Sequence, residues 1–210
     1  MARAWHVGFV GPQPYSASVI TTAGAQVPQA FVRALQSLRH PRLRPGLELE
    51  EVPAPVRVAP FAAALAGTLA HAARPDDELA DGRFIVLHDP EGRDDWQGDF
   101  RVVTLVRAEI EPDLSTDGLL GDVAWSWLLE SLADRVGEVV ALGGTVTRSI
   151  NQTFGALDEQ PDTIELEIRA SWTPTSPDLT AHLHAWSDLL GAVAGQPHLP
   201  EGITSLDEHR

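Results

Sequence analysis

Residues Thr163–Thr173 (TIELEIRASWT) alternate between apolar and polar side chains, and this alternation constrains the fold more than any other feature. Successive side chains of a strand point to opposite faces, so the pattern predicts a strand with one buried face and one wet face. Residues 100–111 (FRVVTLVRAEIE) alternate in the same way, and residues 83–88 (RFIVLH) have the composition of a short buried strand. Glycines 143 and 144 open a further alternating stretch. Together these strands predict a shared sheet.

Three segments show helical spacing instead. The first follows Pro28, the second follows the N-cap candidates Ser115, Thr116 and Asp117, and the third follows Ser176 or Asp178. Apolar residues that recur every three or four positions identify the core-facing stripe of each helix. The predicted stripes are Val27, Phe31, Leu35 and Leu38 in the first helix, Leu120, Val123, Trp127, Leu128 and Leu132 in the second, and Leu179, Leu183, Trp186, Leu190 and Val193 in the third.

Residues 61–73 can be read in two ways. Their alanine content favours a helix, whereas the alternation of larger and smaller residues favours a strand. If they form a strand, the element order is α-β-β-β-α-β-β-α, with a further edge strand expected at Leu47–Val52. Consecutive strands without helices between them predict an α+β fold, an antiparallel β-sheet with helices packed on one face. That order resembles the small acidic chaperones of type III secretion and the YbjN-like proteins, a likeness of fold alone.

A weak internal repeat supports a pseudo-symmetric sheet. Arg-Ala, a proline and Ala-Trp-Ser follow one another at residues 107–126 and again at residues 169–187. Each unit would be a strand pair followed by a helix that carries a tryptophan, Trp125 in one and Trp186 in the other. The alternative is a chance likeness between two capped helices that follow strands.

The domain organisation is expected to be simple. A chain of 210 residues with 43% hydrophobic residues suits one domain. Residues 1–26 are rich in Gly, Pro, Ser and Thr without helical or strand period, which predicts a flexible N-terminal extension. Residues 27–203 are expected to form a single α+β domain, followed by a polar tail at residues 204–210.

The charge balance limits the partners. The chain has 15 basic residues against 30 acidic residues, a net charge of −15, which argues against nucleic acid and against an anionic membrane surface. A basic or amphipathic protein segment would be attracted instead. The absence of cysteine excludes disulfides and thiolate chemistry. Without a signal-peptide pattern or a membrane-length apolar run, the expected location is the cytoplasm.

Several longer motifs carry a family resemblance. They are VLHDPEGRDDWQGDFRVVTLVRAEIEP, WSWLLESL, GGTVTRSINQTFG, IELEIRASWTPTSPDLTAHLHAW and LPEGI. With them the chain resembles an actinobacterial family of unknown function, number 3000, over residues 28–203. The resemblance implies no activity and transfers no catalytic residue, and the first 26 residues lie outside it.

The densest polar cluster follows the strand at residues 83–88. His88 and Asp89 precede Asp94, Asp95 and Asp99, and a histidine among carboxylates could bind a ligand or a metal, or serve general acid–base chemistry. The spacing matches no EF-hand or zincin motif. The alternative is a solvated acidic turn. We expect no metal, no cofactor and no catalytic residue.

Three other residues are candidates for a partner surface. Trp96 could be an exposed aromatic anchor or a lid that folds back on the core, and Trp125 is expected to face outward, at a surface for partners or for a second copy of the chain. Arg148 interrupts the apolar face of its strand, so it would need a buried carboxylate partner or line a pocket. The polar row Thr145, Thr147, Ser149, Asn151 and Thr153 is either a ligand surface or the solvent side of the sheet.

These observations favour a binding module over an enzyme. We expect a protein-binding or chaperone-like adaptor, which could also form a homodimer. The alternative is a small-ligand-binding protein or an enzyme built around the His88–Asp89 loop and Arg148.

Overall fold

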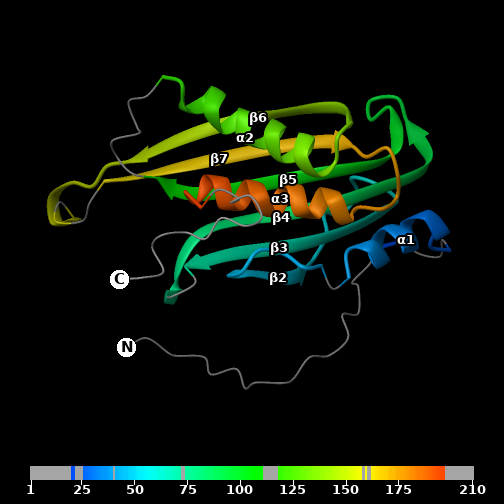
Figure 1. Cartoon of the computed structure of the whole chain (residues 1–210), viewed down its shortest axis with the longest axis horizontal. Helices are drawn as coiled ribbons and strands as arrows, with labels where there is room; N and C mark the ends of the chain where they lie inside the picture. The colour runs from blue at the N-terminus through cyan, green and yellow to red at the C-terminus, as the bar shows by residue number, and fades with distance from the viewer. Residues whose placement is uncertain are drawn as a thin grey trace, which may run out of the picture.

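The computed structural model describes residues 20–21, 26–39, 41–71, 74–110, 118–157, 159 and 162–196. Figure 1 shows a curved sheet with helices against one face. The elements are β1 (Ile20–Thr21), α1 (Gln29–Ser37), β2 (Leu47–Val52), β3 (Phe61–His71), β4 (Arg74–Arg93), β5 (Gly98–Ile110), α2 (Leu120–Arg135), β6 (Val140–Asn151), the short 3-10 helix η2 (Gly155–Leu157), β7 (Thr163–Thr173) and α3 (Thr180–Val193).

The described strands form one seven-stranded antiparallel sheet in the order β1-β3-β4-β5-β7-β6. Strand β2 pairs with β3 over Ala64–Leu69, beside the pairing of β1 with Phe61 and Ala62. The sheet therefore has β6 at one edge and β2 with β1 at the other. This arrangement confirms the predicted α+β class with an antiparallel sheet.

The helices cover one face of this sheet. Helix α3 contacts β4 and β5, α2 contacts β6 and α3, and α1 packs at the end of the sheet through Phe31 against Phe61 (Figure 1). The main core lies between the helices and the sheet. None of the described helices is long and apolar enough to cross a membrane.

Within the ambiguous residues 61–73, Phe61–His71 form strand β3, so the strand interpretation is confirmed and the helix is wrong. The alternation of larger and smaller residues corresponds to the two faces of the strand. Phe61 and Leu69 are buried in the main core, whereas Ala62 and Ala64 are buried on the opposite face. Strand β4 is longer than predicted because it continues through the acidic residues on both sides of residues 83–88. Strand β7 has the predicted bounds, Thr163–Thr173.

The predicted stripe of α3 is confirmed, since all five of its residues are buried. The stripe of α2 is wrong in part: Val123 is 40% exposed and Trp127 is half-buried, whereas Ala124 faces the core. Helix α2 covers only the sheet edge, which leaves a wider exposed arc than the pattern implies. The cap candidates Ser115, Thr116 and Asp117 lie outside the described residues. At α3, Asp178 accepts a hydrogen bond from the Thr180 backbone N–H at 3.0 Å.

A second, smaller core lies on the other face of the sheet. It contains Ala54, Ala62, Ala64, Leu87 and Trp96. Trp96 is only 6% exposed, and its backbone oxygen accepts a 2.6 Å hydrogen bond from the Thr173 hydroxyl. The lid alternative for Trp96 is therefore confirmed and the exposed anchor is wrong.

The predicted flexible extension, residues 1–26, lies largely outside the described residues, as does the polar tail at residues 204–210. Within the extension, Ile20 and Thr21 form β1 against the start of β3.

Candidate functional site

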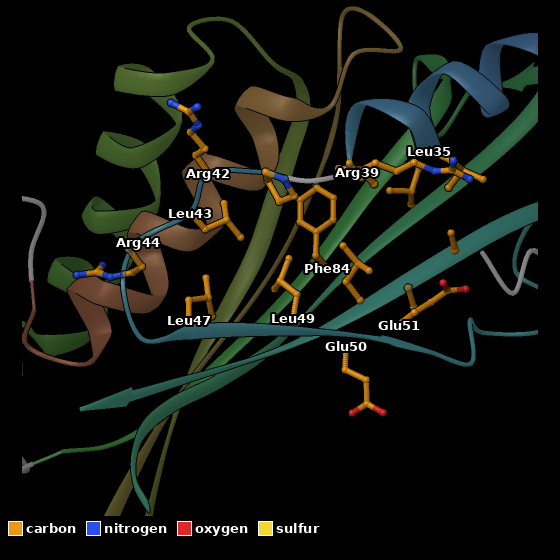
Figure 2. Close-up of a pocket in the computed structure, with 16 residues that line it drawn as sticks. Leu35, Arg39, Arg42, Leu43, Arg44, Leu47, Leu49, Glu50, Glu51 and Phe84 are labelled. Atoms are coloured by element: carbon orange, nitrogen blue, oxygen red, sulfur yellow. The ribbon is translucent and has the colours of Figure 1, made fainter. Parts of the chain in front are cut away.

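A pocket of about 520 Å³ lies between α1, the connection at residues 41–46 and the β2 edge of the sheet (Figure 2). This volume is typical of sites for small organic ligands. Its lining is mostly apolar: Leu35, Leu38, Pro41, Leu43, Leu47, Leu49, Ala63, Ala64, Leu65, Phe84 and Val86, with Arg39, Arg42, Arg44, Glu50 and Glu51.

The floor of the pocket follows from strand alternation. Leu47 and Leu49 of β2 pair with Leu69 and Gly67 of β3, so they share the helix face of the sheet. Beside them, the Trp186 ring of α3 lies directly on Gly67 and Gly82, where an added Cβ would collide. Trp186 thus fills the centre of the helix face of the sheet, and the pocket lies beside its ring, over the part of the face that α3 does not cover.

The roof is the connection from α1 to β2, and it is fastened to α3. Ser37 Oγ accepts a 2.9 Å hydrogen bond from the Leu179 backbone N–H and donates one of 2.7 Å to the Ala34 carbonyl. The Thr180 hydroxyl donates to the Ser37 carbonyl at 3.0 Å. These bonds fix the end of α1 above the floor.

Arg44 makes the second attachment of the roof. Its Nη2 donates to the Gln196 carbonyl at 2.6 Å, and its guanidinium occupies the space that Gly191 leaves by having no side chain. Its Nε and Nη1 atoms are buried without a hydrogen-bond partner among the described residues. Burial lowers the pKa of Arg44, and the charge of Asp188 opposes that shift. Arg44 points away from the cavity in Figure 2 and holds the roof from behind.

Charge is unevenly distributed around the pocket. Residues 1–47 carry five arginines and neither Asp nor Glu, so all 30 acidic residues lie after them. Arg39 and Arg42, which are exposed, lie at the rim on the roof side. On the floor side, Glu50 points to the opposite face of the sheet (Figure 2). The roof side of the rim is therefore basic in a strongly acidic protein, while Glu51 lines the floor side.

The predicted acidic cluster is not assembled into one site. His88 is buried and stacks between Phe31 and Phe100, with ring centroids 5.8 and 4.2 Å away. Its Nδ1 donates to the Asp99 carbonyl at 2.9 Å, and its Nε2 is buried with no hydrogen-bond partner in the part of the chain that the structure describes. The Asp99 carboxylate lies 3.8 Å from Nδ1. His88 is thus a core residue beneath α1.

The other acids of the cluster lie along the β4–β5 hairpin, Asp89 within β4 and Asp94 and Asp95 in the turn. Asp89 accepts a hydrogen bond from the Glu91 N–H at 3.2 Å, a local turn bond. Asp95 accepts two bonds of 3.0 Å from Arg93, which lowers the pKa of Asp95. Asp94 is exposed. Among the described residues, no three His, Asp or Glu side chains are grouped to hold a metal ion.

The remaining candidates are spread over the edge at β6. Trp125 is half-buried rather than outward, because its ring packs over Gly144 of β6. Trp186, its counterpart in the repeat, is fully buried. Arg148 is exposed at the sheet edge, so the expectation of a buried arginine is wrong. The polar row Thr145, Thr147, Ser149 and Asn151 lies on the exposed face of β6.

Sequence reasoning did not find the pocket, because its walls come from three segments that are apart in the chain. One signal was present: the acid-free, arginine-bearing stretch that ends at Leu47. It marks the roof as chemically different from the rest of the protein.

Comparison with known proteins gives a family without an activity. No curated protein and no solved structure matches the chain. The model of one family, described as a protein of unknown function (DUF3000), matches residues 27–204, nearly the whole described domain and the pocket within it. The chain therefore belongs to the DUF3000 family.

Proposed function

We propose that this protein is a small-ligand-binding protein, and that the pocket beneath α1 holds an amphipathic anion such as a long-chain carboxylate. The observation that carries the proposal is the pocket itself: an apolar cavity of about 520 Å³ with arginines at its rim. Ligand sites commonly combine an apolar lining with a few charged groups that fix orientation.

The apolar lining supports the tail of such a ligand. Leu43, Leu47, Leu49 and Phe84 surround the cavity in Figure 2. Each methylene transferred from water to this lining would contribute about 0.8 kcal/mol. Affinity should therefore rise about fourfold with each added methylene until the pocket is full.

The basic rim supports the anionic head. Arg39 and Arg42 lie at the mouth on a stretch of chain without acidic residues. A guanidinium can bind a carboxylate through two parallel hydrogen bonds. A cationic ligand would instead meet two positive charges.

The earlier expectations receive less support from the geometry. A protein-binding adaptor was expected from Trp96 and Trp125, of which one is buried and the other half-buried. The alternative ligand site was expected at His88 and Arg148, which lie on different elements, one in the core and one at the sheet edge.

The test is a calorimetric titration of the full chain with dodecanoate, below the concentration at which it forms micelles. We expect saturable binding, weaker with dodecanol and weakest with dodecylammonium. Ala63→Phe should fill the cavity and abolish binding of all three. The double variant Arg39→Gln, Arg42→Gln should weaken dodecanoate about tenfold and leave dodecanol unchanged.

Arg33→Gln is the matched control, because Arg33 is an exposed arginine on α1, just before the connection that carries Arg39 and Arg42, and does not line the pocket. It should bind like the wild type. Dodecanoate binding that survives Ala63→Phe, or no saturable binding at all, would contradict the proposal.

A further inference from the structure

Strand β6 presents a free edge of the sheet. It pairs with β7, and no described strand lies on its other side. The edge of a strand is a row of backbone donors and acceptors that can pair with another chain. Natural proteins usually protect such an edge with proline and charged side chains, lysine above all. Residues 139–157 contain no proline, and Arg148 is their one charged residue.

Exposed apolar side chains gather at the same edge. Among the described residues, the large hydrophobic side chains that are exposed are Val56, Val58, Leu119, Val123, Leu129, Ile150 and Phe154. Two of them belong to the loop before β3. The other five lie on α2, on the residue before it, or on β6 and the turn that follows, and α2 lies over β6 (Figure 1).

We propose that two copies of this chain associate through antiparallel pairing of β6 with its symmetry mate, which joins the two sheets into one. This inference rests on the β6 edge alone and is independent of the ligand proposal. An antiparallel strand pair can be self-complementary about a two-fold axis, so one surface patch serves both copies.

The distribution of charge makes the β6 edge the part of the surface where a second copy is repelled least. Each chain carries a net charge of −15, so two copies repel each other over most of their surfaces. Along β6 there is no acidic residue to oppose the approach. The two β6 strands can therefore pair without placing acidic side chains directly opposite each other.

The regular part of β6 sets the register. The ladder with β7 is irregular between Val140 and Gly143, where Ala141 has a φ of 50°. Pairing is therefore confined to residues 144–151, and a two-fold axis through Thr147 uses nearly all of them. It places Thr145 opposite Ser149 of the mate and Arg148 opposite Val146. Cross-strand hydroxyl pairs stabilise a sheet, and no like charges face each other.

The same two-fold axis also explains why α2 has exposed apolar residues beside β6. A two-fold axis perpendicular to the sheet places both helical layers on one side of the joined sheet. The two α2 helices then approach across the axis, where Leu129 would lose its exposure, because it lies one turn after Trp125 on the β6 side of α2. Exposed apolar residues on a helix at a sheet edge are expected at such an interface.

The first experiment is sedimentation equilibrium of the full chain between 1 and 200 µM. We expect a monomer–dimer equilibrium in the wild type. The double variant Thr145→Lys, Thr147→Lys should weaken dimerisation at least tenfold, because it places like charges across the axis. Thr68→Lys is the matched control, an exposed threonine of β3 far from this edge, and should dimerise normally. A wild type that is monomeric at 200 µM, or a dimer that the double variant leaves intact, overturns the proposal.

A second experiment tests the pairing without relying on a destabilising change. The chain has no cysteine, so Thr147→Cys introduces a single thiol. Directly opposed residues of an antiparallel pair have Cα atoms about 4.5–5.5 Å apart, within reach of a disulfide. Mild oxidation should cross-link Thr147→Cys into covalent dimers and leave Thr68→Cys without a covalent cross-link. A dimer in which Thr147→Cys does not cross-link overturns pairing through β6.

Discussion

The two edges of the sheet are built in opposite ways. Strand β2 (LELEEV) has glutamates at positions 48, 50 and 51 and lies between Pro45 and Pro53. It is also roofed on the helix face by α1 and the connection that follows, which leaves the pocket. Strand β6 has no acidic residue or proline, and α2 packs over its helix face without leaving a pocket of this kind. The comparison shows that one sheet can keep one edge from pairing while it builds a cavity there, and leave the other edge available.

The largest effect should come from Trp186, which lies between the two edges. Its ring is fully buried on Gly67 and Gly82, and its Nε1 donates to the Leu105 carbonyl at 3.3 Å. Trp186→Ala should lower the free energy of unfolding by about 3–5 kcal/mol. Urea denaturation followed by circular dichroism measures this. A loss below about 1 kcal/mol would show that the two edges do not share this core.

The second largest effect is an acid sensitivity on the α1 side. His182 is buried and accepts a 3.0 Å hydrogen bond from Trp172 Nε1, and burial lowers its pKa to about 4, with the charge of Asp178 opposing the shift. The folded state then binds fewer protons than the unfolded state between pH 4 and pH 6.5. Stability is therefore fully present above about pH 6.5 and falls by about 3 kcal/mol as the pH drops to 4.

Thermal unfolding between pH 4 and pH 7 tests this dependence. His182→Gln can still accept the tryptophan hydrogen bond and cannot titrate, so its stability should change much less with pH. His184, half-buried on the same helix, also has a pKa lowered by burial and leaves a smaller slope. An unchanged slope in His182→Gln would rule out His182 as the source.

Some of this organisation could be predicted from the sequence. The alternation in β5 and β7 and the stripe of α3 reflect burial on one face, so local pattern was sufficient. The position of Trp96 depended on where the β4–β5 hairpin folds, and Val123 is exposed because α2 covers only an edge. The pocket depended on the hydrogen bonds by which Ser37 and Arg44 hold the α1–β2 connection against α3 and the residue Gln196 beyond it. Such long-range contacts leave no periodic signal.

A change in the roof should have an intermediate effect on stability, and it should alter ligand binding without altering dimerisation. Ser37→Ala leaves the Leu179 N–H without its acceptor and frees the end of α1. An unsatisfied buried donor costs about 1–3 kcal/mol. We expect that loss of stability together with weaker dodecanoate binding and unchanged dimerisation. Ser126→Ala is the matched control, since its hydroxyl donates to Val123 within α2, on the exposed side, and it should change neither property.

The smallest expected effect on stability comes from a variant that makes the β2 edge resemble the β6 edge. In the double variant Glu48→Thr, Glu50→Thr, β2 loses two exposed charges. Surface changes of this kind alter stability by less than about 0.5 kcal/mol. If these charges keep the β2 edge from pairing, the variant should form assemblies larger than a dimer in sedimentation velocity. An assembly state identical to that of the wild type would mean that the roof or the prolines protect this edge instead.

The most direct test of the account is methyl NMR of the full chain titrated with dodecanoate. We predict that saturable shifts concentrate on Leu43, Leu47, Leu49 and Leu65, which line the pocket. The methyl groups of Val146 and Ile150 at the β6 edge should not move. Shifts at β6 with none in the pocket, or shifts spread evenly over the molecule, would contradict the assignment of ligand binding to the β2 edge.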